Sequence, residues 1–206
     1  MARQIAIAAT AVVAAGLVGT YLATVAFKPA DFTECRAGQV AGGDIGGPFT
    51  LIDETAATVT DADVITTPSL IYFGYTFCPD VCPLDNARNA QAVEILEEQG
   101  INATPIFISI DPGRDTPEVV ADFTENFHDR MIGLTGSEEQ VAAASRAYRT
   151  FYQKEVDGDP EYYLVDHSTF TYLVLPDAGF MDFYRRDDSP ERIAESVACF
   201  VEAAAN

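Results

Sequence analysis

Two cysteines four residues apart, Cys78 and Cys82, lie between an apolar run and a segment of strong helix formers. The run at 69–73 is rich in branched and aromatic residues, which is typical of a buried strand. Residues 84–99 favour a helix that stops at Gly100. The pair therefore occupies a turn from a core strand into a helix, and α/β sheets with parallel strands place their chemistry in such turns.

The prolines near the two cysteines define the turn more closely. Pro83 inside a helix would clash with the preceding turn, so we expect Cys82 to cap the helix and Pro83 to take its first position. Positions four apart in a helical turn have β-carbons about 5–6 Å apart, close enough for a disulfide or for one metal ion. The helix N-terminus favours thiolates, although Asp80 opposes them. Spacing alone leaves a structural disulfide, a redox pair and a metal site as alternatives.

The chain is strongly acidic, with a formal net charge of −20 over 206 residues. This charge argues against nucleic acid and anionic lipid as main partners. An acidic surface suits a basic partner, a cationic metal or simple solubility. The length suits one domain with appendages and allows a core of normal size.

A stretch near the N-terminus is long and apolar enough to cross a bilayer. Residues 5–27 contain no charged side chain, and Arg3 precedes them. This pattern predicts a short cytoplasmic tail and a membrane anchor over 1–27. The body would then lie in the periplasm, held by a single span at a bacterial inner membrane. Cleavage as a signal peptide near residues 23–26 is the alternative.

The glycine-rich stretch 28–47 predicts a flexible linker, and residues 48–206 the folded domain. Thr116 and Ser137 carry helix-capping signals. The expected elements are a hairpin of 49–52 and 58–60, strands at 69–73, 105–110 and 131–135, helices at 84–99, 117–127 and 138–151, a hairpin of 170–175 and 180–184, and a last helix from 189–190. This order is an α/β, thioredoxin-like plan with the cysteine turn after the first core strand.

His167 is the third candidate ligand. It lies just before the predicted strand at 170–175, and in thioredoxin-like folds the loop entering that strand faces the cysteine turn. Thiol–disulfide exchangers carry a cis-proline there, whereas this chain has no proline between Pro160 and Pro176. An imidazole beside two thiolates suits Cu(I), while Zn²⁺ normally takes a fourth ligand. A surface or hydrogen-bonded histidine is the alternative interpretation.

Two other residues bear on this site. Asp166 is expected either to orient the His167 ring through a hydrogen bond or to be solvated. His128, at the end of a predicted helix, is expected to cap that helix or to face solvent.

Three segments resemble the signature of the Sco/SenC family. They read YFGYTFCPDVCP (72–83), SIDPGRDTP (109–117) and YLVDHS (163–168). With the hairpin around Pro176, they cover residues 70–185 in the family's order. The resemblance implies a membrane-anchored, thioredoxin-like protein that binds one copper ion, as Cu(I) or Cu(II). It also implies a role in assembling the dinuclear copper centre of cytochrome c oxidase.

The resemblance also assigns residues. Cys78, Cys82 and His167 match the family's copper ligands. Phe77 stands where many members carry a histidine, so a fourth ligand at that position is absent. Residues 84–88 depart from the commoner acidic-leucine pattern at the start of the helix, which bears on the surface that would meet a partner.

Cys35 and Cys199 lie outside the signature. Four cysteines allow three pairings. Cys199 lies roughly 140° from the centre of the apolar face of the last helix, so it is not an obvious core residue. The linker that contains Cys35 could run back over the domain. We predict a Cys35–Cys199 disulfide that joins the tether to the terminal helix, with free thiols or an intermolecular bridge as alternatives.

Two functions of different classes follow. In the first, a metallochaperone binds copper and passes it to the copper-centre subunit of the oxidase, with other periplasmic copper carriers or thiol reductases as further partners. In the second, a thiol–disulfide reductase reduces the cysteines of the oxidase copper site, with Cys78 attacking and Cys82 resolving. Replacing His167 by alanine separates the two, because only copper retention depends on the imidazole.

Overall fold

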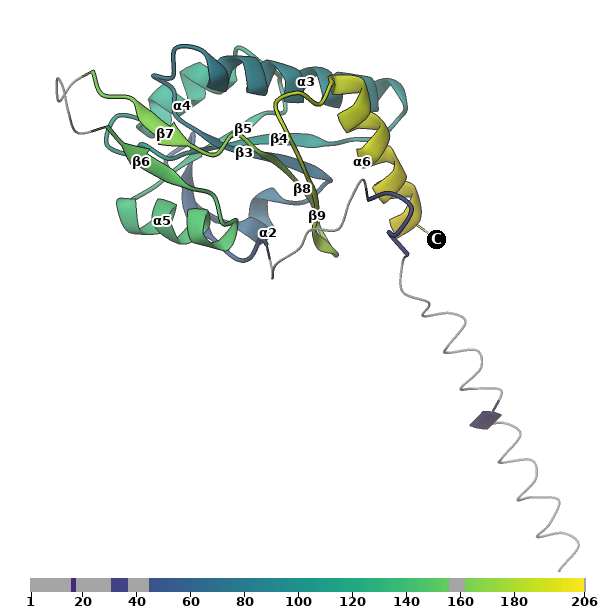
Figure 1. Ribbon diagram of the computed structural model, residues 1–206. Helices are drawn as coiled ribbons and strands as arrows, with labels where there is room; N and C mark the ends of the chain where they lie inside the picture. Colours follow the sequence, from purple (N-terminus) through teal and green to yellow (C-terminus); the bar gives the residue numbers. More distant parts are fainter. Residues whose placement is uncertain (1–15, 18–30, 37–44, 156–161, 206) are drawn as a thin grey trace, which may run out of the picture.

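The domain is built on one mixed sheet of seven strands, in the order β2-β1-β5-β4-β3-β8-β9. The computed structural model describes residues 16–17, 31–36, 45–155 and 162–205 (Figure 1). Within them the strands of this sheet are β1 Thr50–Asp53, β2 Thr58–Thr60, β3 Ser69–Gly74, β4 Thr104–Ser109, β5 Ile132–Thr135, β8 Thr171–Leu175 and β9 Gly179–Tyr184. A separate two-stranded sheet pairs β6, Tyr152–Lys154, with β7, Val165–His167.

Helices cover both faces of the sheet, with α3 and α4 on one side and α5 on the other (Figure 1). The described helices are α2 Asp61–Val64, α3 Val81–Glu98, α4 Pro117–Thr124, α5 Glu138–Ala147 and α6 Pro190–Ala204. β3 is parallel to β4 and antiparallel to β8. This arrangement confirms the thioredoxin-like α/β plan expected from the order of the elements.

The two central strands are buried along their whole length. All six residues of β3 and all six of β4 are buried, because helices shield both faces of this part of the sheet. Such strands are near-continuous apolar runs without alternation. Reactive side chains are therefore expected at the ends of these strands, where the chain leaves the buried sheet.

The ends of the helices differ from the sequence expectations. α3 begins at Val81 rather than at Pro83, with Asp80 as its N-cap. Proline is tolerated there because the N–H groups of a first helical turn have no intrahelical acceptor. α5 ends well before residue 151, because Arg149 adopts a left-handed φ of 53° that terminates the helix. The predicted caps Thr116 and Ser137 are confirmed.

Residues 31–36 lie against α6. The Phe32 ring lies 5.8 Å from the Phe200 ring, and Cys35 is bonded to Cys199. The predicted anchor at 5–27 lies outside the described residues apart from positions 16–17. None of the helices in the described ranges has the length and apolar character that a bilayer crossing requires.

Candidate metal centre

The turn between β3 and α3 brings both cysteines into the interior. The backbone N–H of Cys78 donates to the Tyr75 carbonyl at 3.3 Å, which closes the turn. Cys82 lies in the first turn of α3, and its N–H donates to the Cys78 sulfur at 3.3 Å. Cys78 is 7% exposed and Cys82 is fully buried. The two sulfurs therefore share one small space, as the spacing predicts.

Gly74 makes room for the buried sulfur. A β-carbon at this position would lie 3.0 Å from the Cys82 Sγ and 2.8 Å from the Tyr72 ring, closer than such contacts normally are. The last residue of β3 therefore needs to be glycine, because any side chain would displace Cys82.

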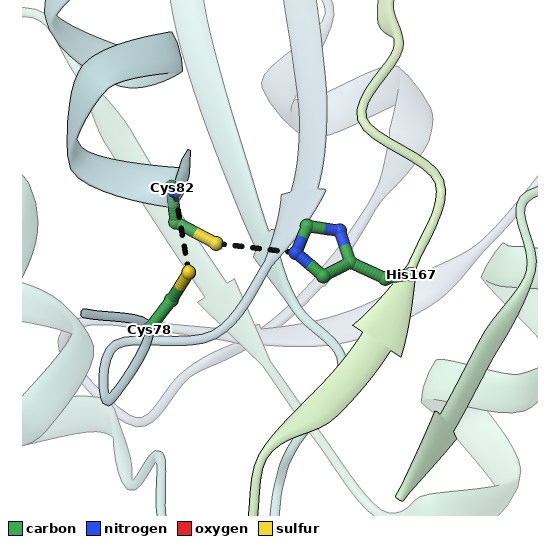
Figure 2. A group of neighbouring side chains, drawn as sticks. All are labelled: Cys78, Cys82 and His167. Atoms are coloured by element: carbon green, nitrogen blue, oxygen red, sulfur yellow. Dashed lines mark hydrogen bonds between the residues drawn. The ribbon is translucent and has the colours of Figure 1, made fainter. Parts of the chain in front are cut away.

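His167 reaches the cysteines from β7. Its Nε2 lies 3.4 Å from the Cys82 Sγ (Figure 2). Its Nδ1 lies 2.9 Å from the Ser168 carbonyl oxygen. A backbone carbonyl can only accept, so Nδ1 donates to Ser168, and Nε2 is the ring nitrogen that faces the sulfurs. The rings of Tyr72 and Tyr75 meet the imidazole edge-to-face, with centroids at 6.1 and 5.8 Å.

The three ligand atoms converge. The two sulfurs and a ring nitrogen of His167 all lie within 4.8 Å of one another. Within the described ranges, this is the one group of three or more His, Cys, Asp or Glu residues that could hold a metal ion. Two thiolates and an imidazole on one side of a small space form a ligand set for a soft cation.

The two thiols differ in protonation. Hydrogen bonding from the Cys82 thiol, helped by the His167 ring and backbone N–H groups, outweighs burial and lowers the pKa of Cys78 to about 3. The same contact with Cys78, together with burial, raises the pKa of Cys82 well above its ordinary value. At neutral pH the pair therefore carries one negative charge, on Cys78.

Comparison with known proteins identifies the family. Residues 37–202 match SCO1/SenC. The protein belongs to the SCO1/SenC family. Protein SenC of Rhodobacter capsulatus is 58% identical over 173 residues, which are 84% of this chain and 78% of that protein.

Solved structures of Sco proteins resemble the domain. Arabidopsis thaliana ScoI with copper bound matches at a TM-score of 0.71 and 38% identity, over 77% of this chain and 99% of that chain. BsSco, described as a member of the Sco family of cytochrome c oxidase assembly proteins with a disulfide switch, matches at a TM-score of 0.64 and 22% identity. That match covers 82% of this chain and 97% of the BsSco chain.

Other residues singled out in this SCO1/SenC sequence lie away from the ligands. Asp166 is exposed, and neighbouring residues of a strand point to opposite faces. The hydrogen bond that was expected between Asp166 and the His167 ring is made instead by the Ser168 carbonyl. The expectation that His128 caps its helix or faces solvent is wrong: α4 ends at Thr124, and the His128 ring is largely buried, with its Nε2 3.3 Å from Glu97 of α3 and its Nδ1 accepting from the Arg130 N–H.

A buried polar group behind Cys82 was not found from the sequence. The Tyr72 hydroxyl donates to Asp85 at 3.0 Å and lies 4.0 Å from the Cys82 Sγ. Asp85 in turn pairs with Arg88 at 3.3 Å. Burial raises the pKa of Asp85, although Arg88 and Tyr72 oppose the shift. An Asp and an Arg three apart at the start of a helix were the available signal, but only the fold shows that both are buried.

Proposed function

We propose that this chain binds one copper ion through Cys78, Cys82 and His167 and delivers it to the copper-centre subunit of cytochrome c oxidase. The observation that carries the proposal is the convergence of the three ligand atoms within 4.8 Å. Metal–sulfur and metal–nitrogen bonds of about 2.0–2.3 Å around one ion bring ligand atoms to roughly 3–4 Å from one another. Small rotations of the side chains are enough to close the site.

The ligand chemistry supports copper. Thiolates with an imidazole favour Cu(I) over harder cations, and the Arabidopsis thaliana relative was solved with copper bound. Cys78 has already lost its proton at neutral pH, so binding must displace only the proton of Cys82. Copper affinity should therefore fall as the pH falls. Delivery would proceed by ligand exchange and begin at Cys78, because Cys82 is fully buried.

We also propose that the domain works on the periplasmic side of a bacterial inner membrane. Residues 5–27 would form the single anchor, 28–47 the linker and 48–206 the copper-binding domain. The uncharged length of the first segment supports an anchor. The disulfide between Cys35 and Cys199 supports an oxidising compartment.

Metal analysis tests the copper proposal. The reduced full-length chain is loaded with Cu(I), freed of excess metal, and compared with Cys82→Ser and His167→Ala. We expect one copper per wild-type chain and strong losses in both variants. His128→Ala is the matched control, because it removes the other histidine of the chain and should leave one copper bound. Equal retention by all four proteins would contradict the proposal.

A thiol–disulfide reductase is the second candidate, and the lowered pKa of Cys78 favours it. The Cys78 thiolate would attack a target disulfide, form a mixed disulfide and release one target thiolate. Cys82 would then attack Cys78, form the intramolecular disulfide and release the second target thiol. This reaction needs no imidazole ligand. Exchange activity retained by His167→Ala together with unchanged copper binding would favour the reductase.

A further inference from the structure

The imidazole and the two sulfurs stand on different parts of the fold. The cysteines lie between β3, a central strand of the seven-stranded sheet, and α3. His167 is the last residue of β7, which pairs only with β6 in a separate two-stranded sheet. The distance from Nε2 to the sulfurs therefore depends on whatever fixes this β6–β7 hairpin to the body of the domain.

A buried carboxylate binds the end of β6 and the segment that leads into β7. Asp111, in the loop after β4, is fully buried. It accepts a hydrogen bond from the Tyr163 hydroxyl at 2.6 Å and pairs with Lys154 at 3.1 Å. Lys154 ends β6, and Tyr163 lies just before β7. Burial raises the pKa of Asp111, but the hydrogen bonds from Tyr163, Arg114 and Lys154 outweigh it, so the pKa lies below its ordinary value.

Arg114 connects this carboxylate to the cysteine turn. Its Nε donates to Asp111, and its Nη1 donates to the Tyr163 carbonyl at 3.0 Å. Its guanidinium carbon lies 3.7 Å from the centre of the Tyr163 ring and 4.7 Å from the centre of the Phe77 ring. Phe77 directly precedes Cys78 in the chain. One planar cation therefore contacts the hairpin and the residue beside the first metal ligand.

We propose that Arg114 is a positioning residue for the metal centre, joining the cysteine turn to the β6–β7 hairpin and keeping the His167 imidazole within reach of both sulfurs. The inference rests on the proposed copper function. No contact joins Arg114 to a ligand atom, and its effect on the metal centre comes from holding the hairpin, which carries His167, against the cysteine turn. Lysine cannot replace it, because an ammonium cannot bind Asp111 and the Tyr163 carbonyl in one plane while stacking on two rings.

A double-mutant cycle on the full-length reduced chain tests the role. Cu(I) affinity is measured by competition with a chromophoric chelator for wild type, Arg114→Gln, His167→Ala and the double variant. Loss of a residue that supports a metal ligand typically costs about 10–100-fold in affinity, and we expect Arg114→Gln to lie in that range. In the His167→Ala background the same change should cost no more than about twofold, because the residue through which Arg114 acts is gone.

Arg192→Gln is the matched control. Arg192 also pairs with an aspartate, Asp188 at 2.9 Å, but lies on α6 away from the hairpin. It should leave copper affinity unchanged. If Arg114→Gln does not fold, Tyr163→Phe removes only the hydroxyl bonded to Asp111. That change should weaken binding in the same direction, again only while His167 is present.

The outcomes separate this inference from the proposed function. Wild-type copper affinity in Arg114→Gln would overturn the inference, as would an equal loss in the presence and absence of His167, which would indicate general damage to the fold. Failure of the wild-type chain to hold copper would instead overturn the proposed function, and this inference with it.

Discussion

The Nε2 atom of His167 lies 3.4 Å from the Sγ atom of Cys82, although 85 residues separate them in the chain. The cysteine is held by a central strand and a long helix, whereas the histidine ends a three-residue strand of a separate small sheet. The metal centre is therefore a product of tertiary structure. Substitutions that loosen either the cysteine turn or the small sheet should lower copper affinity before they unfold the domain.

Cys78 should behave as a thiolate in mildly acidic solution. The pKa of Cys78 is lowered to about 3, chiefly by the hydrogen bond from the Cys82 thiol. Its rate of alkylation by iodoacetamide should therefore be nearly constant from pH 5 to 8, whereas an ordinary thiol with a pKa of about 8.5 gains about tenfold per pH unit. Mass spectrometry of the quenched protein measures the rate.

Cys82→Ala provides the comparison for this experiment. It removes the largest cause of the shift, so the pKa of Cys78 should rise and its alkylation should become pH-dependent. A wild-type rate that climbs steadily between pH 5 and 8 would show that Cys78 is protonated there and would refute the assignment of the charge.

Gly74→Ala should damage the fold and the metal centre together. The added β-carbon would lie 3.0 Å from both the Cys82 Sγ and the Phe107 ring, and overpacking of this kind costs about 1–3 kcal/mol in the free energy of unfolding. Displacement of the sulfur should also weaken Cu(I) binding. Urea titration and chelator competition measure the two effects.

Gly113→Ala is the matched control for Gly74→Ala. A β-carbon at Gly113 would meet its nearest neighbour, the Lys154 Nζ, at 3.8 Å, which is an ordinary contact. This variant should keep wild-type stability and affinity. If Gly74→Ala did the same, the space around the Cys82 sulfur would be larger than the structure indicates.

Local signals in the sequence were enough to predict the main elements. The apolar runs that became β3 and β4, and the capping residues Thr116 and Ser137, act through neighbouring residues alone. The turn that carries the two cysteines was also predicted from neighbouring residues, namely the apolar run before it and the helix formers after it. Helix ends were less predictable, because a single left-handed residue such as Arg149 stops a helix without a glycine signal.

The hairpin that carries His167 could not be predicted. β6 and β7 have three residues each and pair only with one another. Neither is long enough to show the alternation of apolar and polar residues that predicts a strand. The interactions of Asp111 and Arg114 were also hidden, because their partner Tyr163 lies about 50 residues away in the chain. His167 was nevertheless predicted as a ligand from its place before the strand at 170–175, and the resemblance to a known family pointed to the same residue.

The Cys35–Cys199 disulfide should stabilise the domain without affecting the metal centre. It closes a loop with a sequence separation of 164 residues, and restricting an unfolded chain over such a length contributes up to about 4–5 kcal/mol. Cys199→Ser should lower the urea midpoint accordingly. Copper affinity should stay at the wild-type value, because the disulfide lies on α6 and the ligands lie on α3, its preceding turn and β7.

The double variant with serine at both positions controls for the unpaired thiol. It should match Cys199→Ser in stability, because both lack the same bond. A urea midpoint equal to that of wild type in either variant would show that the bond does not restrict the unfolded chain.

Asp111 should make the domain sensitive to acid. Its folded-state pKa is below the ordinary value, because hydrogen bonds from Tyr163, Arg114 and Lys154 outweigh the opposing effect of burial. A lowered carboxylate pKa contributes stability that is fully present above the unfolded value of about 3.9 and is lost as the pH falls through the folded value. Asp111→Asn should therefore cost about 3 kcal/mol at pH 7.

The pH dependence distinguishes this effect from a simple packing defect. Urea titrations at pH 7, 5 and 3 should show the gap between wild type and Asp111→Asn narrowing as the wild-type carboxylate becomes protonated. Asp177→Asn is the control, because Asp177 is exposed in the β8–β9 turn and should leave stability unchanged at every pH. A gap that stays constant down to pH 3 would mean that the charge of Asp111 does not stabilise the loop. The hairpin would then be held to the domain by contacts that do not depend on that charge, such as the hydrogen bond from Arg114 to the Tyr163 carbonyl.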